Sequence, residues 1–256
     1  MNRLTAAAGI EWLKIIRARI FVISFAAACM LPLACGMFLA ILLHPEYAAG
    51  GLLAQKARIA GAADWASYFV LLNEMMSVGG IVIFGFITSW AFGREYADRT
   101  AKDLLALPMP RSAVVLAKYI ALAAWCLLLT AVALAVAVAL GLVINPPGFS
   151  SAALINGGKA FIISALLNLP LIAPVSFVAS FGRGYLPPLG FIIFTVLLGQ
   201  AAEIVGAGGY CPWDMPAIYA GIAGDAVPAA GYALYILTAA LGFGAAVAWW
   251  RYADQQ

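Results

Sequence analysis

Long apolar runs separated by short polar segments form the dominant pattern along this chain. Six runs lack Asp, Glu, Lys and Arg, and each is long enough to cross a hydrocarbon core of about 30 Å, which takes about 20 helical residues. Backbone groups in lipid have no water to bond, and no alternating strand pattern is present, so the spans are expected to be helices. The charge-free runs are residues 20–43, 75–93, 119–144, 160–182, 184–202 and 226–250. With their ends adjusted to the flanking residues, the predicted spans are residues 20–43, 69–93, 115–144, 158–182, 185–204 and 228–250.

Composition supports a membrane protein. Of the 256 residues, 65% are hydrophobic and 10% are charged. Soluble globular domains carry roughly 25% charged residues, so this chain lies far outside their range. The sequence therefore predicts an all-α integral membrane protein that forms one domain over residues 1–256.

The placement of Lys and Arg predicts the orientation. If the N-terminus is cytoplasmic, eleven of the 14 Lys and Arg residues fall on the inner side, and only Lys56, Arg58 and Lys159 fall outside. This bias places both termini and the polar segment after the second span in the cytoplasm. The net charge of +3 then reflects topology and gives no reason to expect nucleic acid as a partner.

Residues 5–19, before the first span, have an amphipathic pattern. An apolar face and a charged remainder predict a helix that lies in the inner membrane interface, with its cations near anionic lipid headgroups. An ordinary basic anchor is the alternative. The apolar face consists of Trp12, Leu13, Ile16 and Ile20, and the charged positions are Glu11, Lys14, Arg17 and Arg19.

The polar segment 94–110 contains six of the chain's 25 charged residues in its first ten positions. Two i, i+4 pairs of opposite charge favour a short helix, which Pro108 and Pro110 would end. The alternative is a solvated loop whose charges only enforce topology. The pairs are Glu95 with Arg99 and Asp98 with Lys102.

Two motifs carry a resemblance to a known family. Glu-Tyr-x-x-x-Thr-x-x-x-Leu-Leu-x-Leu-Pro-x-x-Arg, at residues 95–111, resembles the first cytoplasmic loop of ABC exporter permeases of the bacitracin and lantibiotic-immunity group. Pro-Trp-x-x-Pro, at residues 212–216, resembles an element that this group carries before its last span. The chain departs from its relatives at Asp98 and Arg99, where they often have small or acidic residues.

The resemblance implies that segment 94–110 is a coupling helix that docks on a separate ATPase dimer. It also implies export across a bacterial inner membrane, a second permease (a copy of this chain or a paralogue) and a peptide antibiotic or other amphiphile as substrate. The chain itself would be non-catalytic and hold no cofactor or metal, with ATP and Mg bound by the ATPase. The expected coupling residues are Arg94, Glu95, Tyr96, Arg99, Thr100, Leu104, Leu105, Pro108 and Arg111.

The chain has no phosphate-binding loop of its own. The nearest fragment, residues 157–159, lacks the first glycine and the hydroxyl residue of that motif and lies on the predicted outer side. ATP hydrolysis by this chain is therefore not expected.

Polar and aromatic residues in or near the spans are candidates for a substrate pathway. Such groups are costly at the bilayer centre and often mark a path, although Glu74 and Glu203 could instead reach outer water. Residues 206–227 are too apolar for a free outer loop and are expected to re-enter the membrane, unless their aromatic residues form an ordinary interfacial belt. The pathway candidates are Glu74, Asn168, Gln200, Glu203, Trp213 and Asp214.

Other functions remain open at this point. The chain could be an ion- or lipid-exporting ABC permease, since a fold does not determine a substrate. A secondary transporter usually shows repeated halves and ionisable groups in mid-span, and neither is clear here. A membrane enzyme with a serine–histidine pair is poorly supported, because His44 is the only histidine and no Gly-x-Ser-x-Gly motif occurs.

Overall fold

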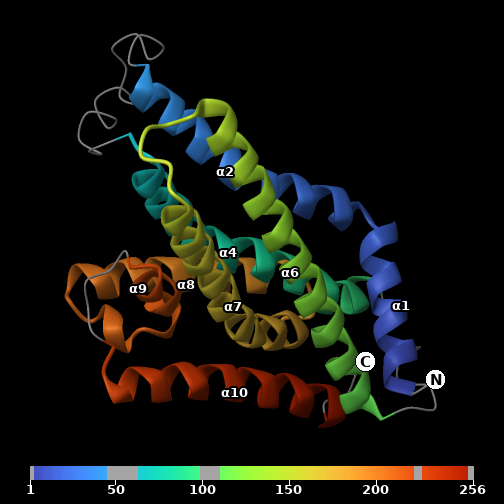
Figure 1. The fold of residues 1–256 in the computed structure, drawn as a ribbon. Helices are drawn as coiled ribbons and strands as arrows, with labels where there is room; N and C mark the ends of the chain where they lie inside the picture. Colours follow the sequence, from blue (N-terminus) through green and yellow to red (C-terminus); the bar gives the residue numbers. More distant parts are fainter. Residues whose placement is uncertain (1–2, 45–62, 99–109, 222–226, 253–256) are drawn as a thin grey trace.

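The computed structural model describes residues 3–44, 63–98, 110–221 and 227–252, and within these ranges every regular element is a helix. Figure 1 shows the helices packed side by side. In chain order they are α1 (Arg3–Arg17), α2 (Arg19–Leu43), α4 (Trp65–Ala97), α6 (Arg111–Ile144), α7 (Ser151–Phe181), α8 (Leu186–Ile204), η2 (Gly208–Tyr210), η3 (Pro212–Asp214), α9 (Met215–Tyr219) and α10 (Ala229–Tyr252).

Six of these helices are long and apolar enough to cross a membrane: α2, α4, α6, α7, α8 and α10. The all-α architecture with six spans is therefore confirmed. Both ends of the chain lie at the same end of the bundle (Figure 1), where Arg111 Nη1 of α6 donates to the Arg251 carbonyl of α10 at 3.2 Å. We call this the proximal end and the opposite one the distal end.

Several helices are longer than the predicted spans. The helix of the second span, α4, continues to Ala97 and so includes residues 94–97, which the sequence assigned to the coupling helix. The third, α6, begins at Arg111, directly after Pro110, which has extended backbone angles. The rest of the predicted coupling helix, residues 99–109, lies outside the described residues.

The first helix, α1, ends where Ala18 adopts extended backbone angles, and the chain changes direction before entering α2 (Figure 1). Ile10, Leu13 and Ile16 of α1 are exposed, whereas Ile15 and Glu11 are buried. Of the apolar face expected from the sequence, Leu13 and Ile16 are exposed, Trp12 is half-buried and Ile20 is buried, and one of the expected charged positions, Glu11, is buried as well. The location of this helix in the membrane interface stays a prediction.

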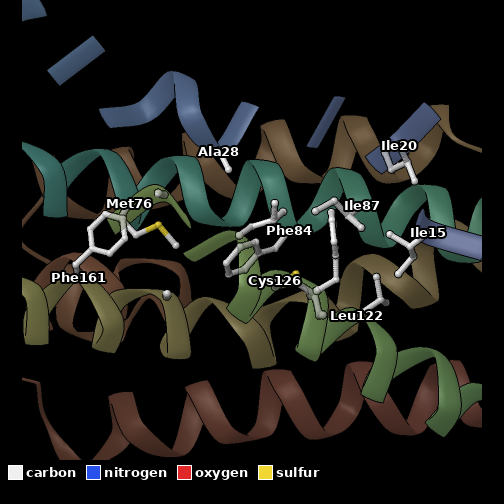
Figure 2. Packing of buried hydrophobic residues seen from close by; sticks show 14 of the residues in the cluster. Ile15, Ile20, Ala28, Met76, Phe84, Ile87, Leu122, Cys126 and Phe161 are labelled. Carbon is white, nitrogen blue, oxygen red and sulfur yellow. The ribbon is translucent and has the colours of Figure 1, made fainter. Parts of the chain in front are cut away.

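The core runs along the bundle between α4, α6 and α7, with α1 and α2 contributing on one side. Figure 2 shows Ile15, Ile87 and Leu122 toward one end of this core and Met76 and Phe161 toward the other. Glycines permit close approach of these helices: a Cβ on Gly80 of α4 would lie 2.5 Å from Nδ2 of Asn168 on α7.

The segment between α8 and α10 folds back in short turns of helix. Its described part, residues 206–221, contains η2, η3 and α9. Met215 and Pro216 are buried, and Ser164 of α7 donates to the Pro216 carbonyl at 3.1 Å. This packing agrees with a segment covered by protein, and its entry into the membrane stays a prediction.

Candidate functional site

Four charged side chains form a closed ring at the proximal end. Lys118 of α6 donates to Glu11 of α1 at 2.9 Å and to Glu95 of α4 at 2.8 Å. Lys14 of α1 contacts the same two carboxylates at 2.7 and 3.0 Å. We call these residues the proximal ring, which joins three helices and has no net charge.

Lys118 is the most deeply buried member of the ring, with 1% of its surface exposed. Its third hydrogen bond goes to the Ala91 carbonyl at 3.0 Å, so all three of its donors are used. A buried charge that lacked such partners would cost several kcal/mol, on the order of the desolvation penalty of one ion. Complete pairing is therefore the reason that a lysine can occupy this position.

Lys14 is more exposed than Lys118, and its pKa reflects two opposing effects, burial and the nearby carboxylates. Burial alone would lower this pKa, but the charges and hydrogen bonds of Glu11 and Glu95 outweigh burial, and the pKa lies above its ordinary value. Lys14 therefore stays protonated at physiological pH.

Aromatic side chains surround the buried lysine and connect the ring to α10. The Lys118 ammonium lies 5.8 Å from the ring centroid of Phe92 and 5.9 Å from that of Trp250. The indole nitrogen of Trp250 donates to Ser180 of α7 at 2.9 Å, and that of Trp249 donates to the Tyr96 hydroxyl at 3.2 Å. The proximal end is thus a connected unit that includes α1, α4, α6, α7 and α10.

The predicted coupling residues divide into two groups. Arg94, Glu95 and Tyr96 form the last turn of α4, and Arg111 is the first residue of α6. The remaining five lie outside the described residues: Arg99, Thr100, Leu104, Leu105 and Pro108.

Glu95 differs from the sequence expectation. A residue that contacts another protein should expose its side chain, but Glu95 is only 4% exposed and bonds to two lysines of its own chain. Arg94, by contrast, lies at the surface, where its Nε contacts Asp98 at 2.9 Å and its guanidinium lies 5.2 Å from the Trp90 ring centroid. Glu95 is therefore held within the proximal ring, and its part in coupling stays a prediction.

Asn168 of the predicted substrate pathway is buried between α7 and α4. Its Nδ2 donates to the carbonyls of Met76 and Ser77 at 3.1 and 3.3 Å. Pro170 and Pro174 follow it inside α7, and Gly242 of α10 packs against the backbone at Pro174. These contacts tie helices together.

Two other pathway candidates, Trp213 and Asp214, lie where η3 packs against α8. The Phe191 and Trp213 rings pack edge to face at 6.3 Å, and the Asp214 carboxylate lies against Gly199, which has no side chain to block it. Gln200 and Glu203 are exposed on α8 nearby. Asp214 thus contacts a position 15 residues earlier in the chain, and we call the residues on both sides of this contact the α8–η3 region.

Glu74 lies apart from this group. Its side chain is exposed and lines a cleft of about 390 Å³ between α2 and α4, with Phe38, Leu42, Tyr68 and Leu71 among the other lining residues. A single carboxylate in a mainly apolar cleft is compatible with contact to a cationic group, and the structure does not join it to the α8–η3 region.

Sequence reasoning missed three members of the proximal ring, Glu11, Lys14 and Lys118. Glu11 and Lys14 were assigned to the charged side of the predicted interfacial helix, and Lys118 was counted only among the cations that set orientation. Lys118 nevertheless lies inside predicted span 115–144, and an ionisable residue within a span usually faces the protein and has a partner. Its partner Glu11 is 107 positions away, too distant for any local pattern to reveal.

No metal centre is found in the part of the chain that the structure describes, where no group of three or more His, Cys, Asp and Glu side chains could hold an ion. The cysteines Cys29, Cys35, Cys126 and Cys211 are free thiols.

Comparison with known proteins assigns the family. The model of the ABC-2 family of transporter proteins matches residues 9–199, which is most of the chain. The chain belongs to this ABC-2 transporter family. It is also 34% identical, over 155 residues, to the bacitracin transport permease protein BCRB of Bacillus licheniformis, covering 59% of this chain and 70% of the relative. The chain is thus a multi-pass membrane permease of the ABC-2 type, and the matched region contains the whole proximal ring.

Proposed function

We propose that this chain is the membrane-spanning half of an ATP-driven exporter and that residues 98–110 couple it to a separate cytoplasmic ATPase dimer. Nucleotide state in the ATPase would favour one conformation of the permease through contacts with this segment, which is the differential interaction that coupling requires. ATP and Mg would be bound by the partner, and this chain would be non-catalytic.

The observation that carries the proposal is the position of the proximal ring. Residues 98–110 join the end of α4 to the start of α6, and the ring bonds Glu95 of α4 to Lys118 of α6 while holding both to α1. A force applied to the connecting segment would therefore move α4, α6 and α1 together. Such a rigid unit transmits a displacement better than helices that can slide independently.

The orientation is part of the proposal. Because Lys and Arg gather at one side of the predicted spans, we place the proximal end and both termini in the bacterial cytoplasm. The α8–η3 region and the Glu74 cleft would then lie toward the outer side, where a substrate leaves.

The proposed substrate is a peptide antibiotic or another amphiphile, supported by the similarity to a bacitracin transport permease. The exposed side chains of Gln200 and Glu203, with the half-buried side chains of Trp213 and Asp214, would contact it, and Glu74 could bind a cationic group. A path between subunits requires a second permease, either another copy of this chain or a paralogue.

Affinity purification of the full chain from its host, after mild cross-linking, tests the ATPase partnership. We expect a protein with a phosphate-binding loop to co-purify with the wild type. The double substitution Leu104→Ala/Leu105→Ala should reduce its recovery by about tenfold or more, which corresponds to about 1.4 kcal/mol.

The matched control is Leu142→Ala/Val143→Ala, which removes an adjacent, exposed apolar pair at the distal end of α6. This variant should retain the ATPase. Recovery of the ATPase with both variants, or loss with both, would contradict the assignment of the docking segment.

A further inference from the structure

A cleft lies between α1 and α4 beside the proximal ring. Its volume is about 450 Å³, and it opens to the surface of the protein. The lining residues are Ile10, Leu13, Lys14, Arg17, Ala18, Trp90 and Arg94.

The charged residues that line this cleft are all cations. Lys14 is held by the ring, and Arg94 contacts Asp98 in a pair whose side chains are 36% and 50% exposed. Exposed pairs of this kind are weak, so Arg94 can turn toward a stronger anion, with its two Nη groups as donors. Among the described residues no carboxylate pairs with Arg17, which leaves one uncompensated positive charge at the mouth.

The remaining walls are apolar and lie where acyl chains are expected. Ile10 and Leu13 of α1 are 56% and 47% exposed, and Trp90 of α4 is half-buried. Tryptophan is enriched at the level of lipid headgroups because its ring is amphipathic. A soluble anion would contact only the cationic residues of the cleft. A molecule with an anionic head and apolar chains would contact both the cationic and the apolar lining residues.

We propose that this cleft binds one anionic glycerophospholipid, with its phosphate on Arg17 and Arg94 and its acyl chains along Ile10, Leu13 and Trp90. The lipid would connect α1 and α4 at the surface of the protein, whereas the proximal ring connects them in the protein interior. This inference goes beyond the proposed exporter function and does not depend on the substrate or on the ATPase.

Native mass spectrometry of the purified full chain in a non-ionic detergent provides the test. Dimyristoyl phosphatidylglycerol and dimyristoyl phosphatidylcholine, which share acyl chains and differ in headgroup charge, are titrated separately. We expect one molecule of the phosphatidylglycerol to bind per chain at least tenfold more tightly than the phosphatidylcholine. Glycerol 1-phosphate, which carries the phosphate without the chains, should not bind in the same concentration range.

Substitutions then locate the site. Each cation near an anionic lipid contributes about 1 kcal/mol, so Arg17→Gln should weaken phosphatidylglycerol binding about fivefold, and Arg17→Gln/Arg94→Gln about 30-fold. The matched control is Arg19→Gln, an exposed cation two positions further along the chain that does not line the cleft. It should leave the affinity within about twofold of the wild type.

Three outcomes would overturn the proposal. Equal binding of the two lipids would show that the cleft does not select charge. Equal weakening by Arg19→Gln and Arg17→Gln would show a diffuse electrostatic effect. Tight binding of glycerol 1-phosphate would show a site for a soluble phosphate. Because the assay contains neither ATPase nor transport substrate, its failure leaves the exporter proposal untouched.

Discussion

The two ends of the bundle are held together by different forces. At the proximal end, four buried or half-buried charges from α1, α4 and α6 bond one another in a ring. At the distal end, Trp65 packs among Tyr68, Phe69 and Phe149, and Gly141 of α6 lets its ring approach the helix backbone. Paired charges thus hold the proximal end, and packed aromatic rings hold the distal end.

This difference has a functional meaning if the proximal end receives a mechanical signal. A ring of charges tolerates movement as a unit but strongly penalises separation of its members, because each separated charge would be left buried without a partner. Among the described residues at the distal end no ion pair is buried, so the contacts between them can rearrange at lower cost. The effects of substitutions on the free energy of unfolding should therefore differ between the two ends, both in magnitude and in whether the effects of two substitutions add.

Removal of the central lysine should have the largest effect. Lys118→Met leaves two buried carboxylates with only Lys14 as partner, and we expect a loss of about 3–5 kcal/mol in the free energy of unfolding. Thermal unfolding in detergent, followed with a thiol-reactive dye that detects the buried Cys35 and Cys126, measures this loss. Lys159→Met, at an exposed lysine on α7, should change little.

A second substitution in the ring separates charge balance from side-chain loss. Lys118→Met/Glu95→Gln removes one positive and one negative charge, leaving Glu11 and Lys14 as a neutral pair. The double variant should be more stable than Lys118→Met alone. Losses that simply add would show that the ring members do not interact, since coupled residues give non-additive effects.

Crowding at the distal end should have a smaller effect. In Gly141→Ala the new Cβ would lie 2.5 Å from Cη2 of Trp65, and the surrounding rings leave that side chain little room to move. We expect a loss of about 1–3 kcal/mol, as is typical of overpacked cores. The same thermal assay applies.

The control for crowding is Gly244→Ala in α10, where no atom lies within 4 Å of the added carbon. This change should be neutral or stabilising by up to about 1 kcal/mol, because alanine favours a helix more than glycine does. Equal destabilisation by both substitutions would argue against close packing as the cause.

The smallest effect is expected at the cap of α4. The Asp64 side chain accepts a hydrogen bond from the Ser67 amide at 2.8 Å, and that bond lowers the pKa of Asp64 below its ordinary value of 3.8. Asp64→Ala should cost about 1 kcal/mol at neutral pH. Since the folded-state pKa is lowered, this contribution is present above pH 3.8 and is lost as the pH falls further.

Ser150, which caps α7 by accepting from the Ala153 amide at 3.0 Å, is the control for this pH dependence. Its hydroxyl does not titrate in this range, so the loss caused by Ser150→Ala should be the same at pH 6 and pH 3. A loss for Asp64→Ala that also stays constant would contradict a role for its charge.

Much of the fold follows from the sequence because the bilayer imposes simple rules. Charge-free runs of sufficient length gave six spans, and the start of α2 differs from its prediction by one residue, at Arg19. Ends set by tertiary contacts were less predictable: α4 extends through Ala97, where Glu95 enters the proximal ring. The position of Pro110 explains why α6 begins at Arg111.

The candidate site was less accessible to sequence reasoning. Hydropathy marks Lys118 and Asn168 as polar residues inside spans, but it does not tell which helix each one faces. Glu11 seemed to belong to a surface helix, and only the packing of α1 against α6 shows that its carboxylate is buried. Long-range pairing of this kind depends on the complete arrangement of helices.

The most direct test of the central claim is site-specific photo-cross-linking in living cells. A photoreactive amino acid at Leu104 should form an adduct with an ATPase, and the same amino acid at Val143, an exposed residue at the distal end of α6, should form none. An ATPase adduct at Val143, or its absence at Leu104 in cells that produce both proteins, would contradict coupling through the segment between α4 and α6.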